Sequence, residues 1–176
     1  KTAKIRLVRP AKDAGAVPVP KATAPHDRSL DSQFEAGKAL RETVPRSTLG
    51  AWKRAADRPD PIALLQASDA ERTPELVPIR DGRMLQSPFA FYRGAAAVMA
   101  SDLSGTPATG IHVQACGDCH LMNFGGFATP ERNVLFDIND FDETLPAPWE
   151  WDVKRLVASL VLASRTNGLS DKVGRE

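Results

Sequence analysis

The strongest constraint on the fold is a polar loop placed between stretches of strand-like sequence. Apolar and polar residues alternate in Ile111–Ala115, which predicts a half-buried strand. Residues 124–128 and 134–139 repeat the strand pattern on either side of a turn-like stretch, so we expect them to pair as a hairpin. Such a hairpin returns the chain to the loop at 117–125. Polar residues from the loop and from the end of the hairpin should then meet.

The polar residues at this meeting point are suited to magnesium. Asn carbonyl and Asp carboxylate oxygens are hard ligands, and Mg²⁺ needs few of them when substrate phosphates and water complete its shell. We therefore predict that Asn123 and Asp140 bind Mg²⁺. Alternation places Val134, Phe136, Ile138 and Asp140 on one strand face, which we expect to be directed to the core. Asp142 continues that face as a possible second carboxylate, and Asp137 is an alternative to Asp140. Asp118 is close by and could accept the proton of an attacking hydroxyl.

The remaining sequence predicts mainly helices. Ser87-Pro88 is a helix start, with Ser as the N-cap and Pro at the first helical position. We expect helices at 30–44, 49–56, 61–67, 88–103 and 149–167, and a short edge strand at 75–80. In the last helix an apolar stripe is formed by Val153, Leu156, Val157, Leu160 and Val161.

Composition and charge limit the possible classes of protein. A hydrophobic share of 42% supports a packed core, and a net charge of +1 gives no general reason to expect nucleic-acid binding. No apolar run approaches the roughly 20 residues that cross a bilayer, so we expect no membrane partner. Two cysteines three residues apart cannot cross-link distant parts of a fold. We therefore predict a reducing, cytoplasmic setting.

Three regions can be distinguished along the chain. Residues 1–28 are basic and rich in Pro and Ala, which predicts a disordered tail. Residues 29–110 are expected to be mainly helical. Residues 111–176 carry the loop, the hairpin and a helix, and we expect this domain to be incomplete at its C-terminal end. The small number of elements predicts that the chain is a fragment of a longer protein.

The loop resembles a known catalytic motif. Gly117-Asp118-x-His120-x-x-Asn123 is similar to the catalytic loop of aminoglycoside phosphotransferases and other kinase-like small-molecule kinases, which usually reads His-Gly-Asp-x-His-x-x-Asn. The segment around Asp140 resembles their metal-binding segment, and the one ending at Asp152 resembles an element whose Asp braces the loop. The resemblance implies that Asp118 is the base. It also implies that Asn123 and Asp140 bind metal and that Asp152 supports the loop.

Most of the chain, from about residue 44 to residue 168, also resembles an uncharacterised bacterial family, domain of unknown function 2252. Three motifs carry this resemblance: Ser87–Gly94, Cys116–Gly125 and Asn139–Thr144. The family implies a kinase-like fold without an established substrate. Its members are normally much longer, which agrees with the expectation of a fragment.

The chain departs from the kinase pattern in two ways. Cys116 stands where the small-molecule kinases usually have His, and neither a Gly-rich phosphate loop nor a clear Val-Ala-x-Lys strand precedes the site. Arg80, Arg83 or Arg93 could take the place of the missing Lys, because a guanidinium can hold phosphate with two hydrogen bonds. His120 is either a catalytic group or an imidazole that hydrogen-bonds the loop backbone.

Other interpretations of the loop remain open. Cys116-x-x-Cys119-His120 matches the haem c attachment motif, and the two cysteines could form half of a zinc site. Cys116 could also be a nucleophile or a small buried residue at the end of a strand.

We predict an α+β fold with a protein-kinase-like, aminoglycoside phosphotransferase-like core. Its function would be ATP- and Mg²⁺-dependent phosphate transfer to an unknown small-molecule or protein hydroxyl. One alternative is a non-catalytic nucleotide- or metal-binding module, and another is a metal-dependent phosphoesterase.

Overall fold

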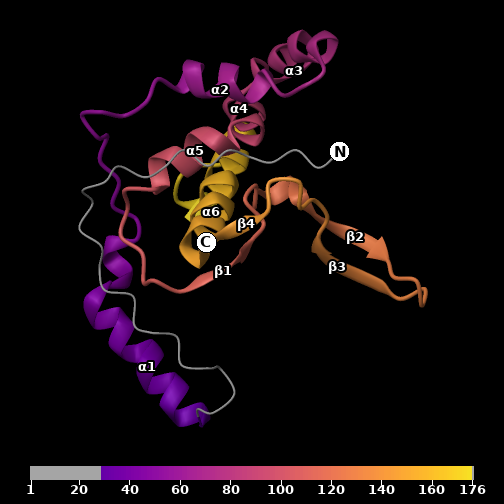
Figure 1. Cartoon of the computed structure of the whole chain (residues 1–176). Helices are drawn as coiled ribbons and strands as arrows, with labels where there is room; N and C mark the ends of the chain where they lie inside the picture. The colour runs from indigo at the N-terminus through magenta and orange to yellow at the C-terminus, as the bar shows by residue number, and fades with distance from the viewer. Residues whose placement is uncertain (1–28, 176) are drawn as a thin grey trace.

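The computed structural model describes residues 29–175, so the predicted tail at 1–28 lies outside the described part of the chain. The helices are α1 (Leu30–Thr43), α2 (Pro61–Asp69), α3 (Val77–Met84), α4 (Pro88–Gly94), α5 (Ala96–Leu103) and α6 (Trp149–Thr166). The strands are β1 (His112–Ala115), β2 (Phe124–Ala128), β3 (Val134–Ile138) and β4 (Leu145–Pro148). Short 3₁₀ turns are η1 (Arg46–Thr48), η2 (Pro74–Leu76), η3 (Leu121–Asn123) and η4 (Val173–Arg175). This mixture is an α+β fold (Figure 1).

The strands form two separate antiparallel pairs. The predicted hairpin is present as β2 and β3, with Phe124 opposite Ile138 and Ala128 opposite Val134. β1 pairs instead with β4, and Ala115 lies opposite Leu145. β4 was not predicted because Pro146 and Pro148 argue against a strand. It is tolerated here because each strand of a two-stranded sheet has a free edge, where the missing N–H groups of proline cost no ladder hydrogen bond.

The hairpin projects from the rest of the molecule (Figure 1). The sequence placed Val134, Phe136 and Ile138 on a face directed to the core, and this expectation is wrong. Val134 is 80% exposed and Phe136 is 75% exposed. Strand alternation predicts which residues share a face, but it cannot show whether another element covers that face.

Three of the helix predictions are confirmed at their starts by side-chain caps. Ser29 accepts a hydrogen bond from the N–H of Ser32 at the start of α1, and Asp60 caps α2. Ser87 Oγ accepts from the N–H of Ala90 at 3.0 Å, so α4 begins where the Ser-Pro signal placed it. Each cap satisfies an N–H group that has no partner within its helix.

Residues 75–80 were predicted to be a strand and are helical. η2 begins at Pro74 and α3 has Pro78 in its first turn. Proline is favourable there because its fixed φ suits a helix and its missing N–H would have no partner at that position. The predicted helix at 49–56 is also absent. This segment is irregular after η1, and it is held from its far end by Arg58, which pairs with Asp102 of α5.

The predicted helix at 88–103 is divided into α4 and α5. The break is at Ala95, with φ −113° and ψ 36°. The carbonyl of Gly94 accepts a hydrogen bond from Arg80 Nη2 at 2.5 Å. A Cβ at Gly94 would overlap the side chain of Met84, so a larger residue there would require Met84 to move. These tertiary contacts explain the break, which the apolar periodicity did not reveal.

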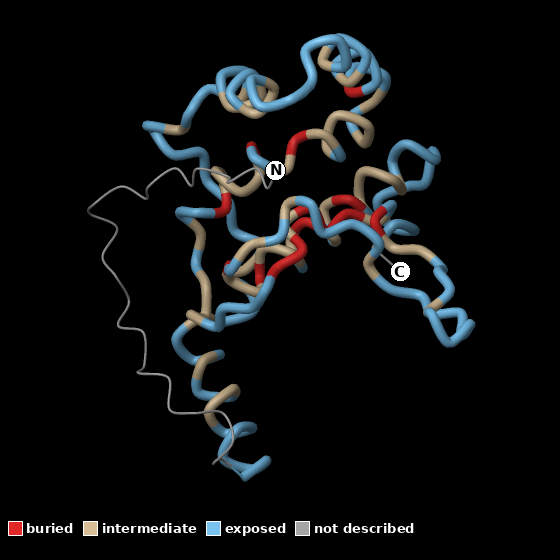
Figure 2. The backbone as a smooth tube through the Cα atoms, turned by 45° about the vertical axis from the view of Figure 1, so that its right-hand side comes forward, coloured by how far each residue is buried: buried red, intermediate tan, exposed pale blue. Residues whose placement is uncertain are grey.

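The buried part of the molecule lies where α4, α5 and α6 meet the end of β1 and the loop after it (Figure 2). Its apolar members are Met84, Ala95, Val98, Leu103, Ala115, Cys116, Cys119 and Ala147. It also contains six polar residues: Asp118, His120, Asn123, Glu150, Arg155 and Ser159. The candidate site is therefore part of the core.

α6 buries a polar face. Its buried residues are Glu150, Arg155 and Ser159, whereas Val153, Val157 and Leu160 of the predicted apolar stripe are 46%, 53% and 43% exposed. Among residues 29–175, each helix is too short or too polar to cross a membrane.

Candidate active site

A sharp turn after β1 brings the acidic segment, residues 136–143, to the loop. Gly117 has φ +83°, which favours glycine, and a Cβ at this position would lie only 2.0 Å from the carbonyl oxygen of Glu143. Thr144 Oγ1 donates to the carbonyl of Ala115 at 2.7 Å. The predicted return of the chain to the loop is therefore present, and it depends on the small size of Gly117.

α6 holds the start of the loop through one carboxylate. Asp152 Oδ2 accepts from the N–H of Cys116 at 2.7 Å, and Oδ1 accepts from the N–H of Gly117 at 3.1 Å. About two turns further along α6, Ser159 Oγ accepts from the N–H of Leu121 at 2.9 Å. The loop is thus held at its start and at its middle by side chains of a single helix.

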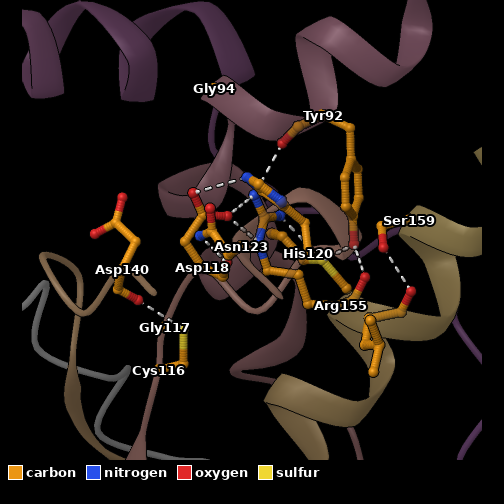
Figure 3. Close-up of polar contacts among 12 residues, drawn as sticks. Tyr92, Gly94, Cys116, Gly117, Asp118, His120, Asn123, Asp140, Arg155 and Ser159 are labelled. Carbon is orange, nitrogen blue, oxygen red and sulfur yellow. Dashed lines mark hydrogen bonds and ion pairs between the residues drawn. The ribbon is translucent and has the colours of Figure 1, made fainter. Parts of the chain in front are cut away.

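Asp118 makes two kinds of contact. Its carbonyl accepts from the N–H of His120 and from Asn123 Nδ2, each at 2.8 Å. Its carboxylate is buried and pairs with Arg155, whose Nε donates to Oδ1 at 2.6 Å and whose Nη2 also contacts Oδ1. The other oxygen, Oδ2, is 3.6 Å from His120 Nε2, which is too long for a hydrogen bond (Figure 3). Oδ2 is therefore the oxygen left to accept a proton.

His120 is a neutral side chain inside the site. It is 3% exposed, and its ring Nδ1 has no hydrogen-bond partner among the described residues. Burial lowers its pKa below the usual value; Asp118 opposes this effect, and the positive charges of Arg155 and Arg93 add to it. Its amide N–H bonds the loop backbone, but its imidazole does not. The side chain is thus placed beside the base without being held by the backbone.

The residues predicted to bind metal lie on adjoining segments. The N–H of Asn139 donates to the carbonyl of Asn123 at 2.8 Å, and Cys116 Sγ lies 3.3 Å from the carbonyl of Asp140. The amide nitrogen of Asn123 is held by Asp118, so its Oδ1 is the ligand atom that remains. Asp140 is exposed, and in Figure 3 its carboxylate points away from Asp118.

The acidic segment has its own local order. Asp140 Oδ1 accepts from the N–H of Asp142 at 3.1 Å. Glu143, which the sequence analysis did not select, is partly buried beside the loop. Its pKa is raised, first by burial and then by the charges of Asp118, Asp140 and Asp142. Within residues 29–175 no three His, Cys, Asp or Glu side chains are close enough together to bind a metal.

The three candidate phosphate-binding arginines have different environments. Arg80 is occupied by Asp69, at 3.0 Å from Nη1 to Oδ1, and by the carbonyl of Gly94. Arg83 is exposed at the end of α3. Arg93 is also exposed, and its charge acts on His120, so it lies beside the loop.

Comparison with known proteins gives one family. Residues 72–176 match the family described as an uncharacterised protein conserved in bacteria, DUF2252. The chain belongs to the DUF2252 family. No curated protein and no solved structure matches it. The matched region starts before α3 and contains the loop, the acidic segment and α6, which are the parts of this DUF2252 protein that form the site.

The two cysteines of this DUF2252 protein are free and buried. Burial is the main cause that raises the pKa of Cys119 to about 12, and it also raises the pKa of Cys116. Metal-binding and nucleophilic cysteines usually have the opposite shift, because the thiolate is the reactive form. The cysteines therefore resemble small core residues more than the start of a zinc site.

Besides Glu143 and Ser159, the sequence analysis missed two further residues of the site. Arg155 reaches Asp118 from 37 positions further along the chain. Arg72 is close enough for its charge to oppose the rise in the pKa of Glu143. One signal for Arg155 was available, because Asp152 and Arg155 are three positions apart and so lie on the same side of a helix. Taken together, the site offers one free carboxylate oxygen, several hard oxygen ligands and exposed guanidinium groups at its edge.

Proposed function

We propose that this protein is a kinase-like phosphotransferase that moves the γ-phosphate of ATP to a hydroxyl group. The observation that supports this most is the direct hydrogen bonding between the loop at 117–125 and the acidic segment. Asp118 and Asn123 lie on one loop fixed by Asp152 and Ser159, and the acidic segment bonds directly to the loop at Asn123. Phosphoryl transfer needs this combination of a positioned base and oxygen ligands for a metal.

Asp118 has the central role in the proposed reaction. Its Oδ2 accepts the proton of the acceptor hydroxyl while the new oxygen–phosphorus bond forms. The bond between the γ-phosphorus and the bridging oxygen breaks, and ADP leaves. Asn123 and Asp140 would bind Mg²⁺, with Asp142 as a further carboxylate, and the donor set fits because all the ligands are hard oxygens. The ion would neutralise the charge of the phosphates.

Other parts of the site fit the same reaction. Arg93 is exposed beside the loop and is our preferred contact for the nucleotide phosphates, since Arg80 is already paired. His120, neutral and next to Asp118, would line the acceptor site. Free thiols and the use of ATP agree with a cytoplasmic location, which stays a prediction.

One observation favours a second candidate, a non-catalytic nucleotide- or metal-binding module of the same fold. The carboxylate of Asp118 is paired with a buried Arg155. A buried ion pair can serve the fold alone, and in that case Asp118 holds the loop and takes no part in a reaction.

Replacing Asp118 by Asn separates the two candidates. We expect phosphate transfer to fall by roughly 100- to 10,000-fold, the usual effect of losing a general base. Affinity for ATP and Mg²⁺, measured by titration calorimetry, should change little because Asp118 is not a ligand. The exchange leaves Arg155 without its anion, so the binding measurement also reports whether the fold survives.

The control is Asp31→Asn at the exposed start of α1, which should alter neither quantity. Asn123→Ala should reduce both binding and transfer, because it removes a metal ligand. The transfer assay follows γ-phosphate against a panel of hydroxyl compounds and the protein itself. If the parent binds ATP but transfers phosphate to no acceptor, the binding module becomes the better explanation.

A further inference from the structure

Arg155 binds Asp118 in an unusual way. Its Nε and Nη2 both contact the same oxygen, Oδ1, and no described residue hydrogen-bonds Oδ2. Arg155 is 2% exposed, and the side chain of Asp118 is 12% exposed. The pairing therefore fixes the carboxylate by one oxygen and leaves the other able to meet a substrate.

A second Arg–Asp pair in this chain shows the more common arrangement. Arg58 Nε donates to Asp102 Oδ1 at 2.5 Å, and Nη2 donates to Oδ2 at 2.8 Å. Two parallel bonds to two oxygens satisfy the whole carboxylate and suit a purely structural contact. Asp118 is different because only one of its oxygens is occupied.

The guanidinium of Arg155 is itself held in place. Its Nη2 donates to the carbonyl of Tyr92 at 2.9 Å, and it lies over the Tyr92 ring with 4.4 Å to the ring centre. Tyr92 Oη donates to the carbonyl of Arg155 at 2.8 Å (Figure 3). Met99 Sδ accepts from Nη1 at 3.6 Å. Contacts from α4 and α5 thus determine where the guanidinium stands, and through it where Asp118 Oδ2 points.

We propose that Arg155 is a positioning residue for the base, and this proposal rests on the proposed phosphotransferase function. Arg155 orients Oδ2 of Asp118 toward the acceptor hydroxyl by binding Oδ1, and Tyr92 holds the guanidinium of Arg155 in place. Arg155 touches no substrate in this scheme. Its effect on the rate therefore has to pass through the carboxylate of Asp118.

A double-mutant cycle on the purified protein tests this dependence. Arg155→Lys keeps the charge but cannot place two donors on one oxygen. We expect kcat to fall by about 10- to 100-fold, because a small misplacement of a reacting group costs up to about that factor. KM for ATP should stay within about threefold. In the Asp118→Asn background, Arg155→Lys should lower the residual rate no further, because coupled residues are not additive.

Arg58→Lys is the matched control, since it alters an Arg–Asp pair outside the site, and it should leave kcat within about twofold. If Arg155→Lys does not fold, Tyr92→Phe is used instead in both backgrounds. It keeps the ring and removes only the hydroxyl, and we expect a loss of roughly two- to tenfold that again disappears with Asp118→Asn.

Three outcomes are possible, and each decides the proposal. A loss of rate that occurs only in protein retaining Asp118, and not in the Asp118→Asn background, supports it. An equal loss in both backgrounds shows that Arg155 is only structural and overturns the positioning role alone. A parent that transfers no phosphate overturns the proposed function together with this role.

Discussion

Asp118 and Arg155 show how single residues place charge in the core of this protein. Both are buried, and each supplies the partner that the other needs. Removing one member of a buried pair typically costs about 3–5 kcal/mol, because an uncompensated charge stays behind. Cys119 has a similar degree of burial but no cationic side chain bonded to it. Burial therefore favours its neutral thiol.

The thiol of Cys119 should be protected from alkylation in the folded protein. Its pKa is raised from 9.0 to about 12, so at pH 8 the reactive thiolate is roughly a thousandfold less abundant than for an ordinary thiol. We expect labelling by iodoacetamide to be slow and to rise about tenfold with each pH unit below the pKa. Mass spectrometry of the labelled peptide gives the rate, and the protein in urea is the control. Fast labelling of the folded protein at pH 8 would contradict the buried thiol.

The residues of the site differ in how far the sequence could predict them. Asp118 and Asn123 were found because their spacing within one loop is local. Gly117 was found with them, although its closeness to Glu143 is known only from the fold. Arg155 was missed because its contact with Asp118 joins α6 to the loop, and no local pattern records such a contact.

At the scale of elements, α6 directs polar side chains into the core, where they bond to the loop. Asp152, Arg155 and Ser159 follow one another at helical spacing and bond to Cys116, Asp118 and Leu121 respectively. A buried loop has backbone N–H groups that require partners. Asp152 and Ser159 accept from such groups, whereas Arg155 donates to the carboxylate of Asp118. The rule that apolar residues face the core therefore failed for α6, whereas the Ser87 cap of α4 was predicted correctly from a purely local signal.

Asp152→Asn should loosen the start of the loop. The amide has one acceptor oxygen in place of two, so either Cys116 or Gly117 loses its partner. An unsatisfied buried donor costs about 1–3 kcal/mol, and we expect the free energy of unfolding to fall by about 2 kcal/mol.

Urea denaturation measures this loss, and hydrogen exchange should show faster exchange of the amides of Cys116 and Gly117. The control is Asp171→Asn, which alters an exposed ion pair with Arg165 and should change stability by less than about 0.5 kcal/mol. If the two variants are equally stable, the hydrogen bonds of Asp152 do not support the loop.

The molecule as a whole combines a small buried centre with extensive exposed apolar surface. The centre lies between α4, α5, α6 and the loop, while the β2–β3 hairpin stands apart from it (Figure 2). Phe124 and Phe136 stack at 6.4 Å within the hairpin, but Phe136 is still 75% exposed. A two-stranded hairpin is only marginally stable by itself, so the hairpin should be the less stable part of the described structure.

Two substitutions by Ala compare how much the buried centre and the β2–β3 hairpin contribute to the free energy of unfolding. Leu103 is 7% exposed on α5, and Leu103→Ala should lower the free energy of unfolding by about 2–5 kcal/mol, the usual cost of a cavity in a core. Phe136→Ala removes an aromatic pair at the surface and should cost less than about 1.5 kcal/mol. Hydrogen exchange should find the amides of β2 and β3 opening well before those of α6, because local opening of the hairpin leaves the centre intact. If Phe136→Ala costs as much as Leu103→Ala, then Phe136 is buried in the folded protein, and the hairpin has a partner surface that lies outside residues 29–175.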